Sequence, residues 1–252
     1  MEERFVPAVA TEGRPIGSPG DGSTASSGAV LADPRALQIL TTEHWSLLTA
    51  RSLVYNETFS RGGMFLAFLS ATLLVLGLIS NATGFSDEFL TIAAVVLGLD
   101  FFVGLATLGR INGASDEDLR YLQGMNRLRH AYHEMVPGLE PYFITSKYDD
   151  FNSVASFYGS PDASPLQGVL HGFTTMPAII SVICAAVGSV LAAVLVLLAT
   201  HDGSLAGIVA ALAFLASFAV FAVFGFRAAT SFIRSMHAQW PAPPRDGPAP
   251  QA

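Results

Sequence analysis

Cysteine and charge are both scarce in this 252-residue chain, and each shortage limits its chemistry. Cys184 is the only cysteine, so neither an intrachain disulfide nor a cysteine-based metal site can form. Charged residues make up 13% of the chain and apolar residues 51%, a balance typical of membrane proteins. The first 30 residues also lack an apolar stretch. We therefore expect no cleavable signal peptide, and the first apolar run must direct insertion.

Motifs that mark common enzyme sites are missing as well. The chain contains neither a phosphate-binding GxxxxGK[ST] loop nor a GxSxG nucleophile turn. A formal charge of −7, without a basic stripe interleaved with aromatic residues, argues against nucleic-acid binding. We therefore expect no enzyme activity, no cofactor and no nucleic-acid partner.

Long apolar runs are the main feature that is present. Each run has about 19 to 24 residues, which at about 1.5 Å per residue crosses the roughly 30 Å hydrocarbon core of a bilayer. We predict an all-α polytopic membrane protein whose four transmembrane helices form two antiparallel hairpins in the lipid bilayer. The runs are Met64–Ala82, Phe89–Gly109, Met176–Ala199 and Leu205–Phe226.

The short connection within each predicted hairpin contains no Lys or Arg. Because basic residues stay in the cytoplasm when apolar helices insert, both termini and the central segment are predicted to be cytoplasmic. Lys147 is the only lysine among 13 basic residues, and this arginine-rich usage favours a GC-rich bacterium and its plasma membrane. The basic residues are Arg4, Arg14, Arg35, Arg51 and Arg61 before the first run, Arg110, Arg120, Arg127, Arg129 and Lys147 in the middle, and Arg227, Arg234 and Arg245 in the tail.

The segments outside the spans differ in composition. A tail rich in Gly, Pro and Ser predicts disorder, and Asp33-Pro34 suits the start of a helix, with Thr41 or Thr42 as another start. Gly62-Gly63 is a candidate kink before the first span. We predict a disordered tail (1–32), an amphipathic juxtamembrane helix (33–63), a first hairpin (64–110), a cytoplasmic helical segment (111–175), a second hairpin (176–227) and a cytoplasmic C-terminal tail (228–252), disordered after Trp240.

The central segment carries its own helix signals. Ser115, followed by three acidic residues, predicts a helix start, and an apolar stripe then continues to Met135, ahead of Pro137. Further helical pieces are expected at 141–143, 149–158 and 166–173. Glu140, Asp149 and Asp150 are expected to cap these helices rather than to act as acids or bases.

Asp100 is the one ionisable carboxyl within the predicted spans, eleven residues into the second run and so near the bilayer midplane. A carboxylate there costs at least about 2.5 kcal/mol, so it usually faces a bundle interior or an aqueous cavity. Thr72, Ser189 and Ser217 lie at similar depth. Either Asp100 lines a proton or cation pathway with these hydroxyls, or it is a neutral acid that holds helices together.

Small residues recur in the third and fourth runs, where they let helix backbones approach closely. Such stripes serve packing within the chain or contact between subunits. A pore would need several copies, because one four-helix bundle fills its own interior, so a homo-oligomer is expected. The helix-packing candidates are Ser181, Ala185 and Ala193, together with Gly207 and Ala211.

His130, His133 and Glu134 fall on one helical face, a spacing that binds zinc weakly. The pattern lacks a fourth ligand, and the neighbouring Arg127 and Arg129 favour a solvated polar face. We therefore predict no metal site.

Two stretches resemble a known group of proteins, namely TTEHWSLLTARSLVYNETFSRGGMF (41–65) and GMNRLRHAYHEMVPGLEPYFITSKYDD (124–150). They are similar to segments of uncharacterised integral membrane proteins of high-GC bacteria. The resemblance implies a four-span architecture with cytoplasmic helices, and it implies no particular activity.

Two functions remain open on the sequence alone. The first is an oligomeric channel or transporter-like protein with Asp100 in its conduction site, which predicts that Asp100 faces a hydrated cavity or a subunit interface. The second is a membrane-anchored interaction protein whose cytoplasmic helices bind a protein partner. It predicts a dry Asp100 and an exposed apolar patch on those helices.

Overall fold

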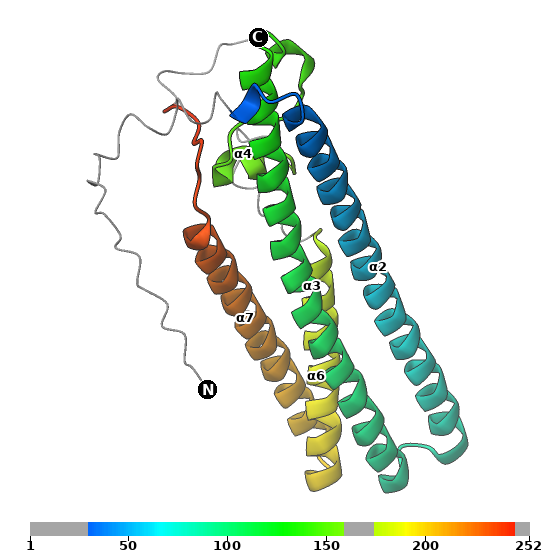
Figure 1. Ribbon diagram of the computed structural model, residues 1–252. Helices are drawn as coiled ribbons and strands as arrows, with labels where there is room; N and C mark the ends of the chain where they lie inside the picture. Colours follow the sequence, from blue (N-terminus) through cyan, green and yellow to red (C-terminus); the bar gives the residue numbers. More distant parts are fainter. Residues whose placement is uncertain (1–29, 159–173, 245–252) are drawn as a thin grey trace, which may run out of the picture.

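The computed structural model describes residues 30–158 and 174–244, and the described part of the chain is all-α, as predicted. Four of its helices are long and apolar enough to cross a membrane. Both hairpin turns lie at the same end of the molecule (Figure 1). The elements are α2 (Ala36–Thr83), α3 (Asp87–Met135), the 3-10 turn η1 (Glu140–Tyr142), α4 (Phe151–Ala155), α6 (Met176–Thr200) and α7 (Gly203–Ser235).

Helix α2 joins the predicted juxtamembrane helix and the first span into one element of 48 residues. At about 1.5 Å per residue it is roughly 72 Å long, more than twice the thickness of the hydrocarbon core. Gly62-Gly63 does not end the helix, which starts at Ala36, three residues after Asp33. The remaining part of α2 therefore stands outside the membrane.

Helix α3 has 49 residues, and the predicted helix start at Ser115 is wrong. Ser115 lies inside α3, where its hydroxyl donates to the Ile111 carbonyl. No proline interrupts the ladder of backbone hydrogen bonds after the span, so the helix continues. Of the acidic residues that suggested a cap, Glu117 and Asp118 instead bind arginines, as described below. We call residues 36–63 of α2 and 110–135 of α3 the arm.

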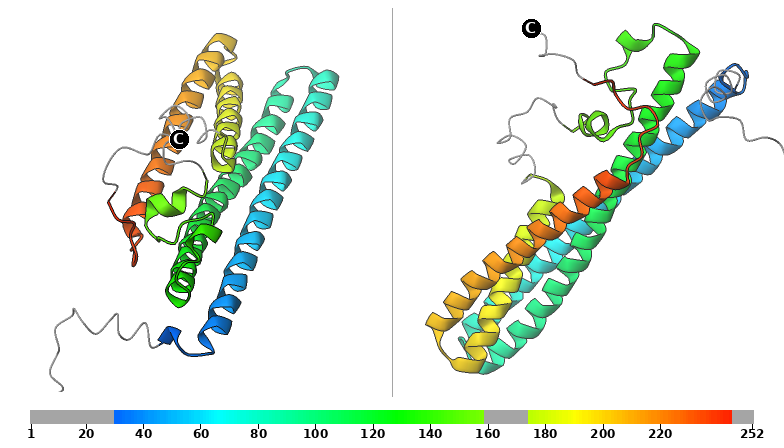
Figure 2. Two further views of the ribbon diagram at one scale, coloured as in Figure 1. Left: turned by 90° about the horizontal axis from the view of Figure 1, so that it is seen from above. Right: turned by 90° about the vertical axis from the view of Figure 1, so that its left-hand side faces the viewer.

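The spans form an open row rather than a closed bundle. Helix α2 packs mainly on α3, α3 on α6, and α6 on α7, so α2 and α7 are the outer members of the row (Figure 2). None of the apolar window of α7 is buried within the chain. Each outer helix therefore keeps one whole side free of contacts within a single copy.

Two apolar clusters hold the row together. The cluster nearer the hairpin turns joins α2, α3 and α6 through Leu76, Leu97 and Val187, and the cluster nearer the arm joins the same helices through Phe65, Leu108 and Cys184. Helices α3 and α6 approach closely at Gly104, where a Cβ atom would lie 2.7 Å from Cys184 Sγ. Asp100 falls between the two clusters.

The chain beyond α7 does not leave the molecule at once. Residues 236–244, which we call the strap, run beside α3 and α4 (Figure 1). Trp240 stacks on His130 with ring centroids 4.7 Å apart. The structure therefore does not have the predicted disorder at 241–244. Of the predicted disordered tail at 1–32, only residues 30–32 are described, and 30 and 31 are helical there. The predicted helix at 166–173 and residues 245–252 lie outside the described residues.

Candidate functional site

Asp100 lies in a thin polar layer between the two apolar clusters. Its side chain is 0% exposed, and Thr72 and Ser189 are buried as well, so α2, α3 and α6 each contribute one buried polar residue. Thr72 is the hydroxyl that interacts with Asp100. Ser189 follows Gly188, which packs against Phe101, so it lies at the depth of Asp100. The structure therefore brings Asp100, Thr72 and Ser189 to one depth in the row of helices.

The Asp100 carboxylate is closed off from solvent and poorly satisfied. Neither Oδ1 nor Oδ2 has a partner at hydrogen-bond geometry within the described part of the chain. Thr72 is close enough to interact without meeting that geometry. The Ser189 hydroxyl is already donated to the Ala186 carbonyl. An anionic carboxylate in this environment is strongly disfavoured, so the arrangement suits a neutral acid or an acid awaiting a ligand.

Ser217 does not join this layer. It is half-buried on α7, whose main packing partner is α6, whereas the layer lies where α3 meets α2 and α6.

The small residues of the two last spans divide by helix. On α6, Ala185 is fully buried and Ser181 and Ala193 are half-buried, so this stripe lies within the row. On α7, Gly207 and Ala211 are exposed, and nothing lies within 4 Å of a Cβ placed on Gly207. Packing within one copy therefore does not involve Gly207, and its role in subunit contact stays a prediction.

Ion pairs between α2 and α3 run along the arm. Arg110 donates through Nε and Nη2 to the two carboxylate oxygens of Glu57, at 3.0 and 2.8 Å, and through Nη1 to Glu117 at 2.7 Å. Arg51 Nε donates to Asp118 Oδ1 at 2.6 Å. Bidentate arginine–carboxylate contacts fix geometry as well as contributing energy. The arm is therefore a rigid pair of helices rather than two independent extensions.

These ion pairs leave the opposite side of α2 without charge. Between residues 44 and 60 the charged residues of α2 are Arg51 and Glu57, and both bind α3. The side facing away from α3 is formed by five exposed residues at three- and four-residue steps, which we call the outer face. They are Trp45, Leu48, Ser52, Asn56 and Phe59, with Trp45 and Phe59 64% and 60% exposed.

A second buried carboxylate, Asp149, was expected to cap a helix, but it clamps the strap instead. Asp149 is 0% exposed and accepts from the backbone N–H groups of Gln239 and Trp240, at 3.0 and 2.8 Å, and from Arg127 Nε at 2.8 Å. Burial raises the pKa of Asp149, but these hydrogen bonds outweigh it and leave the pKa below its ordinary value. Asp150 caps α4, as predicted, and also accepts from Ala242 N–H.

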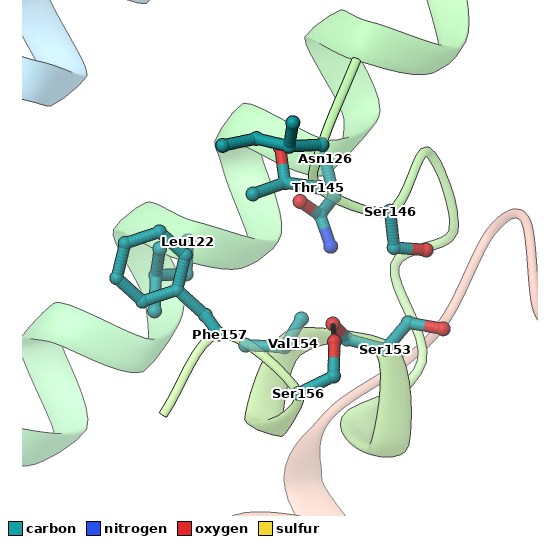
Figure 3. Close-up of a pocket in the computed structure, with 9 residues that line it drawn as sticks. Leu122, Asn126, Thr145, Ser146, Ser153, Val154, Ser156 and Phe157 are labelled. Atoms are coloured by element: carbon teal, nitrogen blue, oxygen red, sulfur yellow. Dashed lines mark hydrogen bonds between the residues drawn. The ribbon is translucent and has the colours of Figure 1, made fainter. Parts of the chain in front are cut away.

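A small cavity lies between α3, α4 and the intervening loop (Figure 3). Its volume is about 40 Å³, which suits one or two water molecules. Its polar lining is already engaged, because Asn126 donates to the Tyr148 carbonyl and Ser153 donates to Asp150. The cavity is too small for an organic ligand.

The predicted histidine face makes aromatic and polar contacts. His130 stacks on Trp240 and pairs with Glu134 at 3.3 Å, and His133 packs against Phe143. Across residues 30–158 and 174–244, no group of three or more His, Cys, Asp or Glu side chains is arranged to hold a metal.

Comparison of the chain with protein-family models, curated proteins and solved structures gives no match. The functional interpretation therefore rests on the geometry of the polar layer, the outer face and the strap.

Proposed function

We propose that the protein is a membrane-anchored interaction protein whose four spans hold a rigid helical arm in the cytoplasm. The observation that carries this proposal is the outer face of α2, where aromatic and aliphatic side chains are exposed and charge is absent. Helices exposed to water normally carry charge on that side. An uncharged apolar stripe outside the bilayer is typical of a surface that another protein covers.

The full burial of Asp100 supports the same function over a channel. A conduction site needs water or a ligand path to the acid, whereas Asp100 is fully buried between apolar clusters. The partner that fits the outer face is a helix with its own uncharged, largely apolar side, since the stripe carries no carboxylate or cation to pair with a charged side chain.

Orientation and membrane follow from the basic residues. We place both termini and the arm in the cytoplasm and the protein in a bacterial plasma membrane, because the hairpin turns contain no Lys or Arg. A protease that cuts the arm in inverted vesicles but not in intact cells supports this placement. Cleavage in intact cells overturns it.

Cysteine labelling tests whether the outer face is covered. Ser52→Cys, in a Cys184→Ala background, places a thiol on the outer face, and Ser115→Cys places a matched thiol on the exposed side of α3 at the level of the arm ion pairs. We expect a water-soluble maleimide to label Ser52→Cys slowly in inverted native membranes and fast in nanodiscs that hold one copy. Ser115→Cys should be labelled fast in both.

Equal labelling rates at the two positions in native membranes would show that the outer face is free. That result overturns the interaction proposal whatever the identity of the partner.

The unpartnered carboxylate of Asp100 favours one second candidate, a proton or cation pathway through the polar layer. This function predicts ion flux in liposomes that contain the purified protein, and loss of that flux in Asp100→Asn. Thr72→Val should reduce the flux, because it removes the hydroxyl that interacts with Asp100. Flux that is absent, or unchanged in Asp100→Asn, excludes the pathway.

A further inference from the structure

We infer that the outer face of α2 binds the same face of a second copy, in a parallel dimer with a two-fold axis along the membrane normal. This inference rests on the proposed function, because it names the partner of the surface described above. Three features lead to this inference. They are the geometry of membrane insertion, the distribution of charge on α2 and the continuation of the outer face into the span.

Membrane insertion limits how two copies can meet. Every copy enters the bilayer in the same orientation, so two α2 helices that touch must run parallel and at equal depth. A closed contact of this kind is isologous, and each residue near the axis meets itself. The surface must then be complementary to its own copy.

Charge is the property that most often prevents such self-pairing, because identical charges would be placed opposite each other. The outer face avoids this problem, since Arg51 and Glu57 are turned to Asp118 and Arg110 of α3. Ser52 and Asn56, which lie on the outer face, each carry both a donor and an acceptor and can hydrogen-bond to their own copies. A polar residue of this kind in an apolar stripe also fixes the register of parallel helices.

The outer face continues without a break into the membrane. At about 100° per residue, Gly63, Ser70 and Gly77 fall on the same side of α2 as Ser52. All three are exposed, and nothing within the described chain lies within 4 Å of a Cβ placed on either glycine. Two α2 helices that meet along the arm can therefore stay together through the span, where small residues allow close backbone approach.

Lipid does not account for the part of the outer face within the arm. Arg51, Glu57 and Arg61 form their ion pairs over this stretch, at the edge of and beyond the apolar span. Polar side chains at this density stay out of hydrocarbon. Trp45 lies 19 residues before Met64, roughly 28 Å along the helix from the apolar span, so a protein surface is what remains to cover it. A second copy is present wherever the protein is.

Disulfide formation between identical positions tests the dimer directly. In a Cys184→Ala background, Ser52→Cys in inverted vesicles should form a covalent dimer with copper phenanthroline, and Asn56→Cys should do the same. Ser115→Cys, the matched control on α3, should remain monomeric. Each variant is first shown to elute as a single species in detergent, so that misfolding is not mistaken for a negative result.

A charge placed on the axis provides an independent test. In the Ser52→Cys background, Asn56→Asp should lower the yield of cross-linked dimer by about two- to threefold, because the two aspartates meet. Co-expression of Asn56→Asp and Asn56→Lys copies should restore it as a mixed dimer. A heterologous or accidental contact gives no such rescue.

The outcomes separate the inference from the function on which it rests. If Ser52→Cys is protected from maleimide in native membranes yet forms no dimer, another protein covers the outer face, and the second-copy inference is overturned while the interaction function stands. If Ser52→Cys is unprotected and does not cross-link, both are overturned.

Discussion

Arg51 and Asp118, 67 residues apart in sequence, join the two helices of the arm through a hydrogen-bonded ion pair of 2.6 Å. Their side chains are 12% and 7% exposed. Phe157 covers the guanidinium of Arg51 at 4.4 Å from its ring centroid. This pair therefore ties α2, α3 and the segment after α4 together.

Arg51→Ala should destabilise the arm by about 3–5 kcal/mol, because it leaves the Asp118 carboxylate buried without its cation. Amide hydrogen exchange of α2 and α3 in detergent micelles measures the change. Arg35→Ala removes an arginine from the exposed Asp33–Arg35 pair and should change nothing. Equal protection in the two variants would show that the buried pair does not stabilise the arm.

Glu57 should remain ionised in acid far below the usual range of glutamate. Hydrogen bonds from Arg110 and then Arg61 lower its pKa from 4.5 to about 2. Because the folded-state pKa is depressed, the contribution of this pair to stability is complete above pH 4.5 and is lost as the pH falls toward about 2. Carboxyl ¹³C NMR of labelled protein should show this midpoint, and Arg110→Gln should move it upward.

Asp149→Asn should release the strap from α3 and α4. The amide substitutes an N–H donor for an oxygen that accepts backbone N–H groups, so at least one charge-assisted hydrogen bond, worth about 1.5–3 kcal/mol, is lost. In a Trp45→Phe background, the fluorescence of Trp240 should shift to longer wavelength as its ring leaves His130. Glu140→Gln, on the exposed η1 turn, is the control and should leave the spectrum unchanged.

The same clamp gives the strap a defined pH dependence. The pKa of Asp149 and that of Asp150 both lie below the ordinary value of 3.8 in the folded protein, because their hydrogen bonds outweigh burial. The strap should therefore stay docked at neutral pH and detach only as the pH falls below about 3.8 through the folded-state values. Release of Trp240 between pH 5 and 7 would contradict this assignment.

Gly188→Ala should loosen the contact between the two hairpins. Its Cβ atom would lie 2.8 Å from Phe101 Cε2, so the ring must move at a cost of about 1–3 kcal/mol. Gly225→Ala on α7 is the matched control, since nothing lies within 4 Å of a Cβ there. Thermal unfolding in one detergent should show a lower midpoint temperature for Gly188→Ala and an unchanged midpoint temperature for Gly225→Ala.

Features that depend on local composition were predictable from the sequence. Four spans, the short connection within each hairpin and the cap of α4 at Asp150 each follow from residues that are close together in the chain. The predicted start at Ser115 was wrong for a related reason. Ser115 and the acidic residues after it have the composition of a helix cap, but Glu117 and Asp118 bind arginines instead of capping.

The amino-acid sequence by itself determined four membrane-length apolar helices, with a helical segment before the first hairpin and another after it, because hydropathy and helix periodicity act over neighbouring residues. Only the tertiary structure decided which side of each helix packs against another helix and which side stays exposed. It buried Asp100 without a hydrogen-bond partner in the described chain and turned Arg51 and Glu57 toward α3. It also brought Asp149 against a strap some 90 residues away. Such contacts depend on how distant surfaces meet, and no local pattern in the chain encodes them.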